Sequence, residues 1–326
     1  MRPLHIDHDG RRLAAILHEH VPPPGALAPA PAPVSAPVSA PVSAPASATA
    51  SATASAPTPA PTPAPTPAPT PAAGAARPST ALLVCNPFGQ EAVRVHRMQR
   101  VLCEQLLRSG LPSLRFDYYG AGESMGDDEQ ADPCGWVGDV LAADRALRAR
   151  TGATRVLWFG ARLGATLALL ASASASADAR PDGLVLWEPV IDGAAYVRCL
   201  SQDHERALRS SFGPFLRRVP RGDRRQWIGF GVGPAMHGQL QALRAPLPPS
   251  GVSVTVIGSP AVADETRFES SLQDWCERAA AQAGSPGPRR VALRHEFDWT
   301  AEEALNTALV PAPAVRLLRA EIEAMR

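Results

Sequence analysis

An arginine stands at the centre of a turn whose surroundings are typical of a catalytic nucleophile. Residues 155–159 predict a short strand whose last four residues are apolar. Residues 160–164 read Gly-Ala-Arg-Leu-Gly, and residues 165–171, mostly Ala and Leu, predict a helix. A tight turn between a buried strand and a helix projects its central side chain over the edge of a sheet. That side chain is Arg162, whose guanidinium stays protonated and cannot attack a carbonyl. Covalent catalysis by a serine is therefore excluded at this position.

Arg162 has two chemical interpretations. The free N–H groups at the start of a helix favour anions, and a guanidinium adds two parallel donors for a carboxylate or phosphate. Alternatively, Arg162 forms an internal salt bridge with Glu188 or Asp192, which follow the next apolar run. A buried and unpaired arginine is very costly, so one of the two must hold if Arg162 is buried. We slightly favour an arginine that faces an open cleft, because the turn aims its side chain towards the end of the sheet.

The elements that position this turn alternate between strand and helix patterns. Two runs at 4–7 and 13–18 flank a His-Asp-Gly turn and predict a hairpin. The sequence predicts further strands at 80–85, 114–117, 155–159, 184–187, 252–257 and 290–293, with helices at 91–108 and 136–150. This alternation predicts an α/β fold with a mostly parallel sheet covered by helices on both faces.

One long segment cannot belong to that fold. Residues 21–78 are almost entirely Ala, Pro, Ser, Thr and Val, so we expect a disordered, extended insertion. The hairpin of residues 1–20 would then join residues 79–326 in one domain. Residues 192–249 are too long for a simple connection between strands and contain helical stretches, so we expect a separate lid.

The composition narrows the class of protein. The chain contains no lysine, its net charge is +1 and its five cysteines include no C-x-x-C pair. Abundant Ala, Pro and Arg indicate a GC-rich bacterial genome, and a near-neutral charge gives no general attraction to nucleic acid. No run reaches the length of a membrane span. We expect a cytoplasmic protein with reduced thiols, without metal or cofactor.

The pattern around Arg162 resembles a known superfamily. Residues 115–124 match R-x-D-x-x-G-x-G-x-S, a loop found in α/β-hydrolases of the serine aminopeptidase-like branch. Together with residues 86–91, 158–165 and 186–190, they resemble the bacterial exosortase A system-associated hydrolases, part of which carries the same G-x-R-L-G-A elbow. The resemblance implies an α/β-hydrolase fold with a helical lid. It also implies a binding site made of Phe88, Gly89 and Gln90 in the oxyanion loop, Ala161, Arg162 and Leu163 at the elbow, and Glu188.

The same resemblance places an acid and a histidine after the last two strands. Asp264 and His295 are the nearest candidates for remnants of a catalytic triad, although for Asp264 we favour the alternative of a helix cap or a solvated acid. His295 lacks the usual Gly-His context, so a partly buried structural histidine is an equal alternative. Three residues are weak candidates for a substitute nucleophile. Cys85 ends a buried strand and is more simply an inert thiol, Ser124 has a structural role in the loop of the resemblance, and Ser259 has no base adjacent in the sequence.

Two functions remain open at this stage. The first is a pseudohydrolase that binds a small anionic or acyl ligand, or a protein partner, without catalysis. The second is a hydrolase or acyl-transfer enzyme with a non-serine mechanism, in which His295 activates water. Arginines are frequent in the expected lid, which indicates either an electropositive entrance for an anionic ligand or ordinary solvated helix faces.

Overall fold

The computed structural model describes residues 1–20, 80–212, 226–258, 266–282, 287–295, 297–299 and 310–326. The chain divides into two compact units, one of Met1–His20 with Arg77–Arg326 and one of Val21–Ala76. The insertion predicted at 21–78 thus lies outside the described residues. The elements described below all belong to the first unit.

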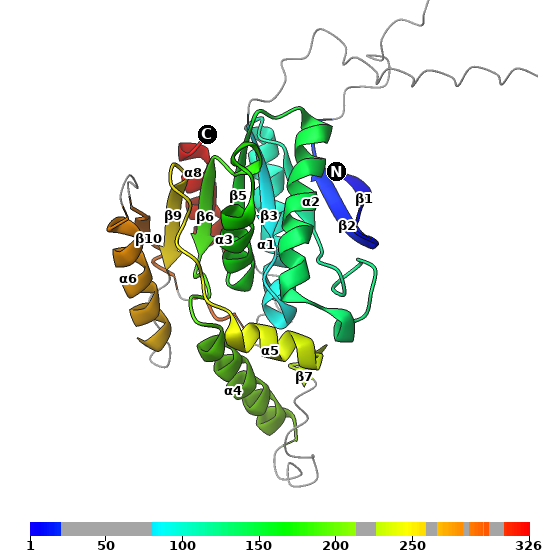
Figure 1. The fold of residues 1–326 in the computed structure, drawn as a ribbon, viewed down its shortest axis with the longest axis vertical. Coiled ribbons are helices and arrows are strands. Elements are labelled where there is room, and N and C mark those ends of the chain that lie inside the picture. The colour runs from blue at the N-terminus through cyan, green and yellow to red at the C-terminus, as the bar shows by residue number, and fades with distance from the viewer. Residues whose placement is uncertain (21–79, 213–225, 259–265, 283–286, 296, 300–309) are drawn as a thin grey trace, which may run out of the picture. The chain divides into compact units, whose positions relative to one another are not determined.

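The core of this unit is an eight-stranded sheet in the order β1-β2-β4-β3-β5-β6-β9-β10 (Figure 1). Its strands are β1 (Arg2–His8), β2 (Arg11–His18), β3 (Thr80–Cys85), β4 (Ser113–Phe116), β5 (Arg155–Ala161), β6 (Gly183–Trp187), β9 (Ser253–Gly258) and β10 (Arg289–Ala292). Neighbouring strands from β4 to β10 run parallel, while β1 and β2 form an antiparallel hairpin whose second strand pairs with β4. The mostly parallel sheet expected from the sequence is therefore present.

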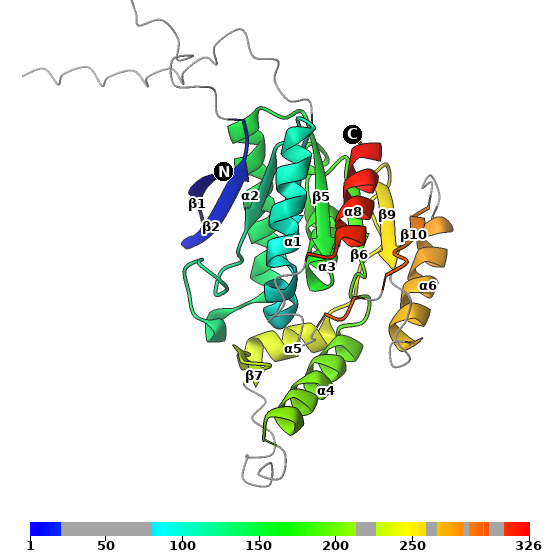
Figure 2. The same cartoon turned by 180° about the vertical axis from the view of Figure 1, so that it is seen from behind.

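The central strands are apolar along their whole length because helices cover both faces of the sheet. All residues of β3, β4 and β6 are buried. On one face lie α1 (Gly89–Arg108) and α8 (Ala312–Ala324), which appear in front of the sheet in Figure 2. On the other lie α2 (Pro133–Thr151), α3 (Leu163–Ser174) and α6 (Thr266–Ala280). Two short 3₁₀ turns complete this core, η1 (Asp128–Gln130) and η2 (Ala177–Ala179).

Helix α2 begins three residues before the predicted start at residue 136. Asp132 accepts a hydrogen bond from the Gly135 amide at 3.1 Å, and Pro133 occupies the first helical position, where its missing N–H costs nothing. The helix ends at Gly152, which has a left-handed φ of 66°. The prediction missed this start because it followed only the apolar periodicity, whereas the cap sets the first turn.

Between β6 and β9 the chain leaves the sheet. It forms α4 (Gly193–Phe212), the short strands β7 (Gln226–Trp227) and β8 (Phe230–Gly231), and α5 (Pro234–Ala242). Helices α4 and α5 contact each other beyond the end of the sheet that carries the start of α3 (Figure 1). Residues 213–225, which hold several of the arginines noted above, lie outside the described part. Among the helices described, none is long and apolar enough to cross a membrane.

Candidate functional site

The turn between β5 and α3 has the backbone of a strained elbow. Arg162 adopts φ 51° and ψ −122°, a conformation that an L-residue other than glycine rarely takes. A Cβ on Gly160 would lie 2.6 Å from Ala165 Cα, and one on Gly164 would clash with the carbonyls of Cys85 and Asn86. The two glycines therefore allow the helix to approach the neighbouring strand closely, while the central residue bears the strain.

The Arg162 side chain points into the protein and is neutralised there. Only 7% of the side chain is exposed. Its Nε donates to Glu91 Oε1 at 3.0 Å, and one terminal nitrogen lies 3.5 Å from Glu188 Oε2. Glu91 belongs to the first turn of α1, and Glu188 follows β6 with its own positive φ of 46°. Arg162 and Glu188, both with a positive φ, thus form an ion pair inside the protein. Glu91 adds a second carboxylate to the same guanidinium.

Two aromatic residues complete this group. The Tyr196 hydroxyl, from α4, donates to Glu91 Oε2 at 2.8 Å, and the Trp299 indole N–H donates to Glu188 Oε2 at 2.6 Å. The Arg162 guanidinium carbon also lies 5.8 Å from the Tyr196 ring centroid and 5.5 Å from that of Trp299, which suits cation–π attraction. We call these residues, Arg162, Glu91, Glu188, Tyr196 and Trp299, the elbow cluster.

Burial dominates the titration of the elbow cluster. Loss of solvent raises the pKa of the Glu91 carboxyl, although the Arg162 charge and the hydrogen bonds from Tyr196 and Arg162 oppose that shift. Burial also raises the pKa of Tyr196 well above its usual value, with the Glu91 charge acting in the same direction. Tyr196 therefore remains a neutral donor at physiological pH, so its proton stays on the phenol and faces Glu91.

The expectation of a cleft-facing Arg162 is wrong. The side chain is buried, and its geometry is that of the internal salt bridge with Glu188. Asp192, the other suggested partner, pairs with Arg244 at 3.3 Å and accepts the Ala194 amide at 2.8 Å. The physical reason is that a buried guanidinium is costly when unpaired, and Glu91 and Glu188 compensate the Arg162 charge inside the protein.

The remaining residues of the predicted binding site lie around this cluster. Ala161 and Leu163 are fully buried beside Arg162. The Phe88 ring is also buried, 6.1 Å from Trp136 and 6.3 Å from Phe230 between ring centroids. Gly89, with φ 59°, and Gln90 are partly exposed at the start of α1. Whether these residues contact a ligand stays a prediction.

Whether the expected triad remnants come together stays a prediction, because the structure does not describe Asp264. Asp264 and Ser259 lie outside the described residues. His295 follows β10 and is exposed, so the alternative of a partly buried structural histidine does not hold. Burial raises the pKa of the Cys85 thiol, which keeps it protonated. Ser124 accepts the Ala14 amide at 2.8 Å and donates to the Asp117 carbonyl at 2.6 Å, so it fastens the hairpin to the loop after β4.

Three members of the elbow cluster were missed from the sequence. Glu91 carried a usable signal, since an acid in the first turn of α1 would face the elbow if that loop lay where the resemblance placed it. Tyr196 and Trp299 gave none. Within the described residues, no group of three or more His, Cys, Asp or Glu side chains is arranged to hold a metal ion.

Comparison with known proteins agrees with this geometry at the level of the fold. Est1E from Butyrivibrio proteoclasticus, solved with ferulic acid bound, superimposes with a TM-score of 0.54 at 14% identity, over 99% of this chain and 98% of that one. A hypothetical protein from Pseudomonas aeruginosa superimposes with a TM-score of 0.53 at 14% identity, over 100% of this chain and 93% of that one. Mouse alpha/beta hydrolase domain-containing protein 10 superimposes with a TM-score of 0.50 at 12% identity, over 100% of each chain.

No family model matches the sequence, and neither does any curated protein. The structural likeness, together with the parallel sheet and the elbow after β5, establishes the architecture. The chain has the α/β-hydrolase fold.

Proposed function

We propose that this protein is a pseudohydrolase, which has the hydrolase architecture but binds a ligand or partner without catalysis. One observation carries the proposal: the elbow position holds Arg162, and Glu91 and Glu188 neutralise its charge inside the protein. Acyl transfer through an enzyme intermediate needs a nucleophile at this point, and a guanidinium in an ion pair is not one.

The elbow cluster also argues against an anion site at the same position. Both carboxylates already accept hydrogen bonds from Arg162, Tyr196 and Trp299. An incoming anion would have to displace a buried carboxylate and leave it unpaired, which costs several kcal/mol, on the order of 3–5. A small anionic or acyl ligand would therefore bind elsewhere on the surface.

The alternative, a hydrolase that activates water through His295, has weaker support. A general base must lie within hydrogen-bond reach of the water that it activates, and that water must lie close to the bound substrate. His295 is exposed to solvent beyond β10. The resemblance to exosortase A system-associated hydrolases supports a link to exopolysaccharide and exosortase systems.

Labelling with a fluorophosphonate probe tests this proposal. We expect no labelled serine in the full chain and no burst of product from an activated ester, with an active serine esterase as the positive control. Either stoichiometric labelling or a burst would contradict the pseudohydrolase. Steady ester turnover that His295→Ala abolishes would establish the water-activating enzyme instead, whereas turnover equal to the uncatalysed rate in both proteins supports the proposal.

A further inference from the structure

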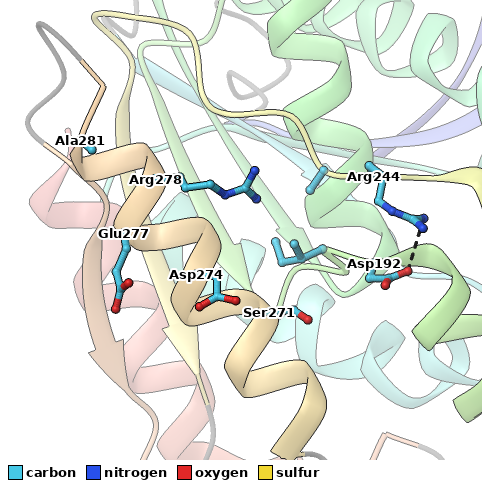
Figure 3. Close-up of a pocket in the computed structure, with 9 residues that line it drawn as sticks. Asp192, Arg244, Ser271, Asp274, Glu277, Arg278 and Ala281 are labelled. Atoms are coloured by element: carbon cyan, nitrogen blue, oxygen red, sulfur yellow. Dashed lines mark ion pairs between the residues drawn. The ribbon is translucent and has the colours of Figure 1, made fainter.

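A hollow of about 750 Å³ lies away from the elbow cluster, between α6 and the base of the segment that leaves β6 (Figure 3). Its lining residues are Ile191, Asp192, Arg244, Ala245, Ser271, Asp274, Glu277, Arg278 and Ala281. No member of the elbow cluster lines it. A volume of this order is typical of pockets that bind small organic molecules.

One wall of the hollow is held in place by the backbone. Asp192 and Arg244 face each other in an isolated antiparallel bridge, and their side chains pair at 3.3 Å. Asp192 also accepts the Ala194 amide at 2.8 Å, and Arg244 donates to the Leu243 carbonyl at 2.7 Å. This wall therefore carries a compensated ion pair whose two side chains are already fixed.

The opposite wall, on α6, carries two charged side chains that no described residue pairs with. Asp274 and Arg278 are four residues apart, in the order that favours an ion pair along a helix. Yet neither side chain has a hydrogen bond or ion-pair partner among the described residues. In Figure 3, Arg278 extends from α6 across the hollow towards the loop that carries Arg244, and the Asp274 carboxylate lies one turn away. Both charges are exposed and available to a ligand.

We propose that this hollow binds a short peptide by its two free ends, with the terminal carboxylate at Arg278 and the terminal ammonium at Asp274. A simple polyanion is disfavoured, because Asp192, Asp274 and Glu277 outnumber the two arginines of the lining. A ligand with one charge of each sign complements both unused groups at once. Ser271 offers a hydroxyl to its amides, and Ile191 and Ala245 provide apolar contact.

The spacing of the two charges selects the length of the ligand. Residues four apart on a helix have Cβ atoms about 5–6 Å apart, and Arg278 extends away from Asp274. A single amino acid holds its charges on one carbon, whereas an extended chain spans about 3.3–3.6 Å per residue. Two to three residues therefore fit better than a free amino acid. This inference does not depend on the chemistry at the elbow, so the two proposals can fail separately.

Titration calorimetry of the full chain with four probes tests the inference. We expect saturable binding of trialanine, and binding at least tenfold weaker for N-acetyl-trialanine, trialanine amide and free alanine. Absence of saturable binding by trialanine would overturn the proposal. If a blocked peptide binds as tightly as trialanine, the blocked end does not contact the site. If free alanine binds as tightly as trialanine, the site does not require a peptide. Either result contradicts the proposal.

Two variants assign each end of the peptide to its residue. Arg278→Ala should bind trialanine and its amide equally, and Asp274→Asn should bind trialanine and its acetylated form equally. Arg97→Ala, which removes another exposed arginine that has no described partner, should bind like the parent chain. Because all three side chains are exposed, thermal unfolding should show unchanged folding. Full discrimination retained by both α6 variants would overturn the assignment.

Discussion

Among the described residues, two arginines are buried, and the surrounding residues compensate their charges in different ways. Arg162 lies at the elbow with two carboxylates beside it. Arg115, on β4, is 5% exposed, and among the described residues no carboxylate forms an ion pair with it. Its Nε donates to His18 Nε2 at 3.3 Å, and one terminal nitrogen lies 3.5 Å from the His96 carbonyl oxygen.

The difference shows that a buried arginine can stabilise the fold at one position and be a poorly compensated charge at another. At the elbow, each charge depends on its partner, so removal of the arginine leaves buried anions. In β4 the arginine is itself the poorly compensated charge, and burial lowers the pKa of its guanidinium. Its hydrogen-bond partner His18 must stay neutral, because only an unprotonated Nε2 can accept the hydrogen bond from Arg115.

The largest expected effect is at the elbow. Arg162→Met should lower the free energy of unfolding by about 3–5 kcal/mol, because Glu91 and Glu188 become buried without a cation. Protonation of these acids relieves part of the loss, so the effect should shrink at low pH. Urea unfolding at pH 7 measures the loss, and urea unfolding at pH 5 shows whether the loss becomes smaller. Arg97→Ala is the surface control. A loss under about 1 kcal/mol at pH 7 would contradict a compensating role for the arginine.

The next effect concerns pH at β4. Burial, assisted by the Arg115 charge, lowers the pKa of His18 from 6.5 to about 4. The unfolded chain therefore binds a proton between these values that the folded chain does not, so stability present above pH 6.5 is lost as the pH falls to about 4. A shift of this size corresponds to about 3 kcal/mol.

His18→Gln is the matched control for that titration, because its amide oxygen can still accept from Arg115 and does not titrate. Unfolding free energies of parent and variant should converge as the pH falls from 6.5 to 4. The difference between the two proteins removes the contributions of other acids, including Glu91. A constant difference over this range would show that His18 does not stay neutral in the folded protein.

The smallest effect is expected from Arg115→Met. This change leaves no carboxylate unpaired, since only the neutral His18 and a carbonyl lose a donor, so we expect a loss of about 1 kcal/mol or less. It should also raise the His18 pKa and so weaken the acid loss described above. Chemical denaturation at pH 7 and pH 4.5 tests both. A loss as large as that of Arg162→Met would erase the distinction between the two arginines.

The sequence predicted the sheet well for a physical reason. The runs at 80–85 and 184–187 are apolar without alternation, which is characteristic of strands covered on both faces, and all of their residues are buried. The elbow glycines also indicated where β5 must meet α3. Element ends were less accurate where a cap or a proline, as at Pro133, decides the first turn.

The partners of Arg162 were only half predicted, because side-chain pairing depends on the tertiary structure. Glu188 was identified because it follows the adjacent strand. Glu91 lies 71 residues away from Arg162, and Trp299 lies 111 residues away from the Glu188 to which it donates. Nothing in local periodicity relates such positions. The preference for a cleft-facing Arg162 failed for the same reason. The sequence does not indicate that Tyr196 and Trp299 pack beside Arg162 and its carboxylates.

The elbow cluster has a consequence for how this chain could change over evolution. A single exchange of Arg162 for serine would restore the residue that a hydrolase needs. It would also leave Glu91 and Glu188 without their cation, and it would supply no imidazole at the elbow. The serine variant would therefore be less stable than the parent protein. In the proposed pseudohydrolase, this cost would oppose a return to serine catalysis through a single substitution.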